Sequence, residues 1–178
     1  NAERAKLWVM IEATPNLDWL LLTKRPENIM RMTPDAWALG LPANVWAGTS
    51  VEDQQRADER IPELLRVPAR VRFLSCEPLL GPIDLDHYLI DDWTRIGGNV
   101  HYHDHPALHW VIAGGESGPG ARPMHPDWAR GLRDQCVAAG VAYHFKQWGE
   151  YNPEWSDTAE CWHSARVGKH AAGRLLDD

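Results

Sequence analysis

Residues 110 to 124 read Trp110-Val-Ile-Ala-Gly-Gly-Glu-Ser-Gly-Pro-Gly-Ala-Arg-Pro-Met124. This segment starts as an apolar run, which is typical of a fully buried strand, and passes into a glycine-rich turn. Pro126 and Asp127 then mark the first turn of a helix. A strand, a glycine loop and a helix form the unit with which α/β proteins present backbone N–H groups to a ligand. The alternative is a tight turn that needs glycine only for its backbone conformation.

The same layout recurs along the chain, which favours repeated βα units and a mainly parallel sheet. Apolar runs predict strands at 19–23, 45–49, 71–75, 110–114 and 142–147. Five units are too few for an eight-stranded barrel. The fold class is therefore α/β, either an open sheet or part of a barrel. We expect a partial (β/α) barrel whose N-terminal units are missing, because the chain opens at Asn1 directly into a helical pattern.

Helix signals lie between the predicted strands. Thr33 and Ser50 are expected as N-caps, and Pro62 is expected to break or restart the helix that follows Ser50. The domain prediction is a C-terminal part of a β/α barrel over 1–150, with an insertion at 79–109, and a tail at 151–178. Helices are predicted at 3–13, 26–32, 85–90 and 126–139, and a hairpin over 166–176 that turns at 170–173.

Composition limits the functional classes. The formal net charge of −7 argues against a protein made chiefly to coat nucleic acid, although a local basic cleft stays open. No run approaches the ~20 apolar residues of a membrane span. The three cysteines, Cys76, Cys136 and Cys161, are far apart, which favours a reducing, cytoplasmic setting over a disulfide framework.

Polar side chains follow every predicted strand, at the end where parallel α/β folds bind ligands. If the strands are neighbours, one rim brings together the cations Lys24, Arg25 and Lys146 and the acids Glu77 and Glu116, which could bind a ligand's charged and polar groups. The alternative is that these residues form structural ion pairs that close the rim. Predicted cofactor-binding residues are Thr49, Ser50, Gly114, Gly115, Glu116 and Ser117. Predicted substrate- or anion-binding residues are Lys24, Arg25, Ser75, Glu77, Arg122, Lys146 and Gln147.

Two other groups suggest chemistry. The side chains of His101, His103 and His105 would lie on one face of an extended segment, as metal ligands can. No cysteine or paired histidine completes a metal site, so a solvated loop is favoured. Cys76 lies between Ser75 and Glu77 without an evident base, so a small buried residue is favoured over a nucleophile.

Several segments together resemble a known family, the phage gp thirty-seven/sixty-eight-like family, which is uncharacterised and phage-associated. The resemblance covers nearly the whole chain in the right order. It is carried by Leu21-Leu-Thr-Lys-Arg-Pro26, Val45-Trp-Ala-Gly-Thr-Ser-Val-Glu-Asp-Gln54, Arg72-Phe-Leu-Ser-Cys-Glu-Pro-Leu-Leu-Gly-Pro82, Trp110-Val-Ile-Ala-Gly-Gly-Glu-Ser-Gly118, Arg122-Pro-Met-His-Pro126 and Phe145-Lys-Gln-Trp-Gly149.

The resemblance implies a radical S-adenosylmethionine (SAM)-like barrel with a 4Fe–4S cluster held by three upstream cysteines, a motif that this sequence lacks. SAM is therefore the expected cofactor, with a cluster only if that motif exists upstream. Glu116 and Ser117 are expected to bind the SAM amine or ribose, and Lys24, Arg25 and Lys146 anionic groups. The chain by itself should not catalyse radical chemistry.

Two other functions stay open: a non-catalytic module that binds nucleotide or nucleic acid, and a metal-dependent hydrolase that uses the histidine loop. The expected partner is a small-molecule or nucleotide substrate, with nucleic acid possible and no membrane. The sequence leaves the oligomeric state open.

Overall fold

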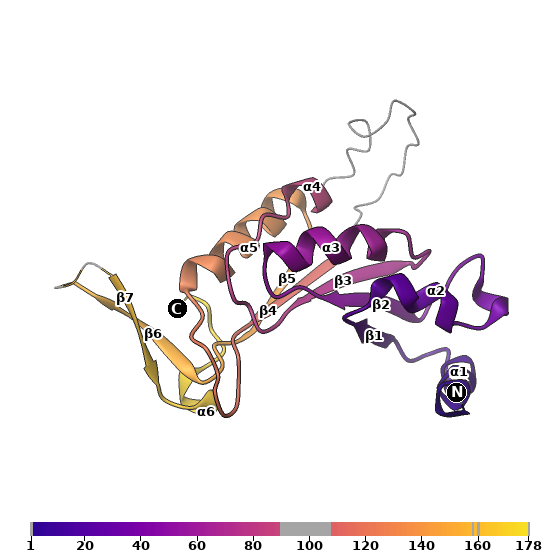
Figure 1. Cartoon of the computed structure of the whole chain (residues 1–178), viewed down its shortest axis with the longest axis horizontal. Helices are drawn as coiled ribbons and strands as arrows, with labels where there is room; N and C mark the ends of the chain where they lie inside the picture. Colours follow the sequence, from indigo (N-terminus) through magenta and orange to yellow (C-terminus); the bar gives the residue numbers. More distant parts are fainter. Residues whose placement is uncertain (1, 90–107, 158, 160, 178) are drawn as a thin grey trace.

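A five-stranded parallel sheet forms the centre of the molecule. The computed structural model describes residues 2–89, 108–157, 159 and 161–177. The strands lie in the order of the sequence (Figure 1). All four neighbouring pairs are parallel, as predicted. The strands are β1 (Trp19–Thr23), β2 (Val45–Ser50), β3 (Val71–Cys76), β4 (Trp110–Gly114) and β5 (Ala142–Gln147).

The two long crossover helices cover one face of this sheet. A right-handed crossover between sequential parallel strands always places its helix on the same side, and α3 and α5 lie together above the sheet in Figure 1. The α-helices are α1 (Ala2–Ala13), α2 (Ile29–Met32), α3 (Gln54–Leu65), α4 (Asp86–Leu89), α5 (Pro126–Ala139) and α6 (Lys169–Ala172), and the 3₁₀ turns are η1 (Pro26–Asn28) and η2 (Asp35–Trp37).

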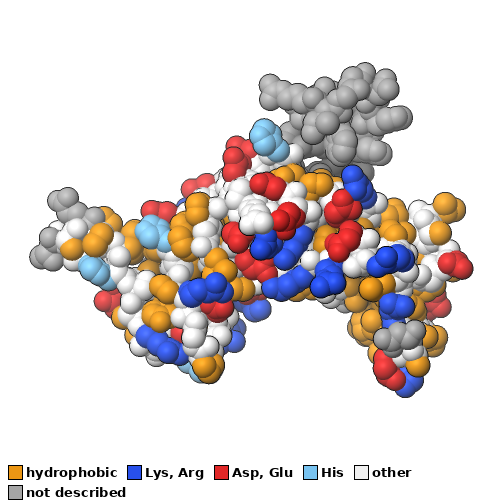
Figure 2. Space-filling model, in the orientation of Figure 1, with side chains coloured by type: hydrophobic (Ala, Val, Ile, Leu, Met, Phe, Trp, Pro, Cys, Tyr) orange, Lys and Arg blue, Asp and Glu red, His pale blue; other side chains and the backbone are white. Residues whose placement is uncertain are grey.

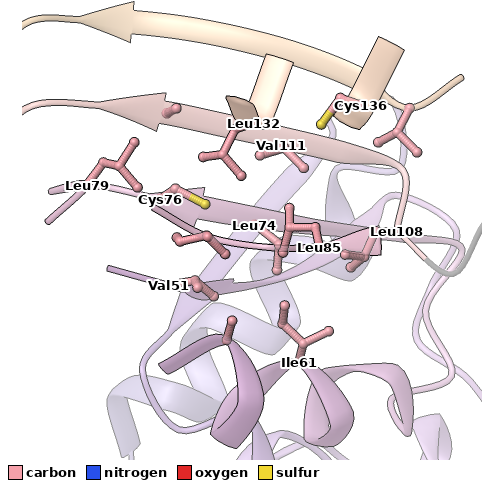
Figure 3. Packing of buried hydrophobic residues seen from close by; sticks show 14 of the residues in the cluster. Val51, Ile61, Leu74, Cys76, Leu79, Leu85, Leu108, Val111, Leu132 and Cys136 are labelled. Atoms are coloured by element: carbon pink, nitrogen blue, oxygen red, sulfur yellow. The ribbon is translucent and has the colours of Figure 1, made fainter. Parts of the chain in front are cut away.

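The main core fills the space between the sheet and these helices. Leu74 and Val111 point from the sheet towards Ile61 of α3 and Leu132 of α5, and all four are fully buried (Figure 3). Successive strand residues point to opposite faces, so the same strands present a second set of side chains on the other side. The candidate site is built on that second set.

The helix α1 is fixed to the edge of the sheet by a smaller cluster. Ile11 packs with Trp37 and Val45, and the indole rings of Trp8 and Trp37 lie 5.1 Å apart. The Asn44 amide donates to the carbonyls of residues 14 and 17, each at 3.2 Å. Thr14 O also accepts from Leu17 N at 3.1 Å, so the Asn44 side chain adds a second bond to this turn and ties the end of α1 to the start of β2.

Three expectations about helix boundaries were wrong. Ser50 belongs to β2, and the N-cap of α3 is Asp53, whose carboxylate accepts from Arg56 N at 2.9 Å. Pro62 lies inside α3 without ending it, because the last turn buries Leu64 completely in the core. Thr33 caps no α-helix, since only the 3₁₀ turn η2 follows it.

The predicted tail hairpin was also wrong. The hairpin is instead formed by β6 (Tyr151–Ser156), which runs antiparallel to β7 (Cys161–Arg166), and 169–172 is the short helix α6. In β6, Tyr151, Pro153 and Trp155 alternate with polar residues, a strand signal that the polar composition concealed. The hairpin extends away from the sheet (Figure 1).

The predicted insertion at 79–109 is described only in part. Residues 83, 85 and 89 are buried in the main core, so the beginning of this segment is part of the fold. The Gln135 amide holds it against α5 through Leu85 N at 2.6 Å and Ile83 O at 2.9 Å. His101, His103 and His105 lie outside the described residues. No helix among the described residues is long and apolar enough to cross a membrane.

Candidate functional site

The sheet face opposite α3 and α5 carries a row of aromatic side chains. We call Trp46, Phe73, Trp110 and His144 the aromatic row; they come from β2, β3, β4 and β5. Ring centroids lie 6.1 Å apart for Trp46–Trp110, 6.0 Å for Phe73–Trp110 and 6.4 Å for Trp110–His144. Leu20 and Leu22 on β1 extend this face and are 44% and 50% exposed. Phe73 is buried, at 2% exposure, whereas Trp46 and Trp110 are half-buried and His144 is exposed. The face therefore presents these three rings and the two leucines to solvent.

A glycine makes room for the Phe73 ring in the aromatic row. The Phe73 ring covers Gly48, and a Cβ added there would come within 2.3 Å of the ring. Gly48 pairs with Phe73 in the strand register, so any larger residue would push the ring off the face.

A polar rim lies beside the aromatic row, at the C-terminal ends of β3, β4 and β5. We define the polar rim as Ser75, Glu77, Gly114 and Lys146. Ser75 Oγ donates to Glu77 Oε2 at 3.3 Å, and Lys146 Nζ donates to the same oxygen at 3.2 Å. Glu77 lies above Gly114, where a Cβ would be 2.7 Å from Glu77 Oε1. Of the residues expected to converge on one rim, Glu77 and Lys146 meet here, beside Ser75 and Gly114.

The cation predicted at the end of β1 is engaged elsewhere. Lys24 hydrogen-bonds to Glu52, whose other oxygen accepts from Arg60 at 2.8 Å. Burial opposes ionisation of the Glu52 carboxyl, but the Lys24 hydrogen bond and the Arg60 charge outweigh it, so the pKa of Glu52 lies below its ordinary value. Glu52 therefore joins the ends of β1 and β2 to α3 as a structural group.

Glu116 pairs with Arg122 within the glycine loop. The Arg122 guanidinium binds both carboxylate oxygens, at 2.8 and 2.9 Å, and Arg122 N donates at 2.9 Å. The hydrogen bonds from the side chain and then the backbone of Arg122 lower the pKa of Glu116 to about 2. This closed pair fits the alternative in which the ionic groups are structural.

Gly115 is needed for a close approach between two backbone segments. A Cβ at Gly115 would lie 1.9 Å from Trp148 O, and one at Gly149 would lie 2.1 Å from Glu116 O. Gly115 N donates to Gln147 O, and Glu150 N donates to Glu116 O, both at 2.9 Å. The side chains of Ser117 and Gln147 also bond across this crossing, at 3.1 Å.

The remaining predicted residues have local roles. Thr49 is fully buried and donates to Thr23 O at 2.9 Å, which joins β2 to β1. Ser50 is buried, and its carbonyl accepts from Arg60 at 2.8 Å. Arg25 is exposed, and its backbone N–H donates to Thr23 Oγ1.

The cysteines do not form a site. Cys76 and Cys136 are fully buried, and Cys161 is exposed on β7. Burial raises the pKa of Cys76 far above its ordinary value and that of Cys136 to about 12, so neither thiol is an available nucleophile. Over the described part of the chain, no three His, Cys, Asp or Glu side chains are placed to hold a metal ion.

The charges on the molecule are mixed. On the face shown in Figure 2, Lys and Arg side chains lie beside Asp and Glu side chains. A nucleic-acid surface usually presents a basic patch, so this face does not resemble one. The polar rim and aromatic row offer something different: one cation, one anion and a hydroxyl beside aromatic rings.

The sequence analysis did not predict the aromatic row as part of a site, nor Glu52 as the partner of Lys24 and Arg60. The row had a signal, because Trp46, Phe73 and Trp110 occupy strand positions of the same parity as the rim residues. Uniformly apolar strands conceal this alternation, since both faces are apolar.

A family model described as Protein of unknown function (DUF5131) matches residues 1–178. The chain belongs to this family. No curated protein and no solved structure matches the chain.

Proposed function

We propose that the sheet face opposite α3 and α5, which we call the open face, binds a small nucleoside-type ligand in this DUF5131 protein. SAM is the specific candidate. The supporting observation is that the Glu77–Lys146 pair lies at the end of the same sheet face as the aromatic row. Small-molecule sites combine apolar and aromatic walls with a few convergent polar groups, and this face has that composition.

The aromatic row and the polar rim together offer a contact for each chemical group of such a ligand. A purine ring would pack against the aromatic row, because every nucleobase offers a π-face. Ribose hydroxyls or an amine would donate to the Glu77 carboxylate, and a carboxylate group would accept from Lys146. Glu116 is not assigned a ligand here, because Arg122 already binds both its oxygens.

We further propose that the chain is the C-terminal part of a radical-SAM-like β/α barrel. The sequential parallel order of β1 to β5, with α3 and α5 on one face, supports a barrel-type arrangement. The cysteines here do not fit a 4Fe–4S cluster, since two are buried and the third is on the hairpin. No radical step can therefore be assigned to this chain.

Calorimetric titration with SAM, S-adenosylhomocysteine and adenosine tests the proposal. We expect binding of the first two, weakened about tenfold in Lys146→Gln, which corresponds to about 1.4 kcal/mol. Trp110→Leu should also weaken binding of SAM and S-adenosylhomocysteine, because it removes a stacking ring. Lys169→Gln, at an exposed lysine without a hydrogen bond or ion pair to any described residue, is the matched control.

Lack of binding by all three ligands at millimolar concentration would overturn the proposal. Equal affinity of wild type and Lys146→Gln would reject the polar rim as the binding site. Salt-sensitive binding of single-stranded DNA, together with no binding of SAM, would favour the non-catalytic nucleic-acid module instead.

A further inference from the structure

A cavity lined in part by Trp148 lies between the start of α5, the base of the β6–β7 hairpin and the C-terminal segment 173–177. Its volume is about 620 Å³. Small-molecule sites typically span roughly 300–1,000 Å³, so the cavity has a suitable size. None of the polar rim or aromatic row residues lines it. Figure 1 shows the C-terminal end of the chain beside α5 and β6.

Two tryptophans form fixed walls of this cavity. Trp148 is buried, and its indole Nε1 donates to Leu175 O at 2.7 Å. Trp162 is held under the guanidinium of Arg130, which lies 5.0 Å from the ring centroid. Leu176 and Pro153 complete an apolar lining. An apolar ligand body would find these surfaces already in place.

The arginine in the wall is already neutralised. Arg130 Nε lies 2.9 Å from Asp177 Oδ1, and its Nη1 lies 3.2 Å from Asp127 Oδ1. The Asp177 carboxylate also pairs with Arg133. The hydrogen bond from Arg130 lowers the pKa of Asp177, which therefore stays ionised in this network. Arg130 thus shapes the wall and has little charge to offer a ligand.

Two polar side chains of the lining are uncommitted. Arg174 is exposed, and neither its guanidinium nor the Asn152 amide makes a hydrogen bond or ion pair with any described residue. A guanidinium and an amide N–H₂ are both donors, and a planar guanidinium matches a carboxylate in shape. The lining is part polar and part apolar, and it holds one uncommitted cation. A single cation favours a singly charged ligand over a dianion, particularly on a chain with net charge −7.

We propose that this cavity is a binding site for a small organic carboxylate. The ligand's apolar body packs against Trp148 and Trp162, and its carboxylate accepts from Arg174 and Asn152.

Ligand-observed NMR and calorimetry with three probes test this assignment. Indole-3-acetate carries a planar apolar body and a carboxylate, indole-3-ethanol lacks the charge, and inorganic phosphate lacks the apolar body. We expect indole-3-acetate to bind at least about tenfold more tightly than either other probe, because only it satisfies the walls and Arg174 together. Arg174→Gln and Asn152→Ala should each weaken indole-3-acetate and leave indole-3-ethanol unchanged.

The controls separate this site from the open face. Arg70→Gln, at an exposed arginine just before β3, should bind indole-3-acetate as wild type does. Lys146→Gln should also leave it unchanged, so failure of the SAM proposal and failure of this one are distinguishable. No binding of indole-3-acetate, equal binding of the neutral probe, phosphate binding as tight as the carboxylate, or an Arg174→Gln variant with wild-type affinity would overturn the assignment.

Discussion

Lys146 Nζ lies 3.2 Å from Glu77 Oε2. Lys146 belongs to β5 and Glu77 follows β3, and these two strands are not neighbours in the sheet. The strand β4 runs between β3 and β5, and its Gly114 has no side chain to keep them apart. A Cβ at Gly114 would lie 2.7 Å from the other Glu77 oxygen. The glycine loop therefore brings an acid and a base together over the end of the sheet.

The two adjacent glycines of this loop should respond differently to alanine. In Gly115→Ala the new Cβ meets a backbone oxygen, Trp148 O, so the chain must move; we expect a loss of at least about 2 kcal/mol in the free energy of unfolding. In Gly114→Ala it meets the end of the Glu77 side chain, which can turn away, and lies 3.3 Å from Gln147 O, which needs only a small shift. We expect a loss of about 1 kcal/mol. Urea unfolding of both variants measures the difference.

Gly140→Ala provides the reference for these two variants. Gly140 ends α5 with a φ of 68° and has open space around it, so alanine should cost about 1 kcal/mol through its backbone conformation alone. A Gly115→Ala variant no less stable than Gly140→Ala would contradict the close approach to Trp148.

The Glu116–Arg122 pair should make stability depend on acid pH. The folded pKa of Glu116 is lowered to about 2, below the value of about 4.3 expected in the unfolded chain. Its contribution is therefore complete above about pH 4.3 and is lost as the pH falls through about 2. Glu116→Gln should be less stable than wild type at pH 6, and this difference should shrink steadily towards pH 2. Chemical unfolding across that range measures it.

A constant difference between wild type and Glu116→Gln from pH 6 to pH 2 would show that the carboxylate charge is not what Arg122 stabilises. Glu27→Gln is a suitable control, because Glu27 is exposed on η1 and forms no ion pair with a described residue.

The strands were predictable because each is a short apolar run that ends in polar residues. The 19–23, 110–114 and 142–147 predictions match β1, β4 and β5. Their parallel pairing followed from the helices between them. That Lys146 and Glu77 come close followed from this arrangement. The pairing of Lys24 with Glu52 was not predictable, since it depends on side-chain directions that residue spacing does not encode.

The C-terminal part was harder to predict, because two short strands and a short helix leave weak periodicity. The turn predicted at residues 170–173 is instead largely part of the helix α6. Its position depends on tertiary contacts: Val167 N and Gly168 N both donate to Glu150 O at 3.0 Å. Glu150 also accepts from Gly118 N at 3.1 Å, so this residue ties the hairpin to the glycine loop.

Asn44 should be important for the attachment of α1. Its amide donates to Thr14 O and Leu17 O, and Asn44→Ala would leave both carbonyls without this partner. We expect a loss of about 1–2 kcal/mol in the free energy of unfolding. Faster amide hydrogen exchange in residues 2–13 should accompany it. Asn16→Ala, at an exposed asparagine in the same turn, should change neither quantity by a comparable amount.

The three cysteines should differ sharply in reactivity towards a thiol reagent such as DTNB. The thiolate is the reactive form, and burial raises the pKa of both Cys76 and Cys136. Cys161 is exposed on β7, with its Sγ 3.5 Å from His163 Nε2. In the native protein we expect one thiol to react rapidly and the other two only as fast as the core opens. Cys161→Ser should remove the rapid phase, and urea should expose the two remaining thiols. Rapid reaction of two or more thiols in native wild type would contradict the packing of β3 against α5.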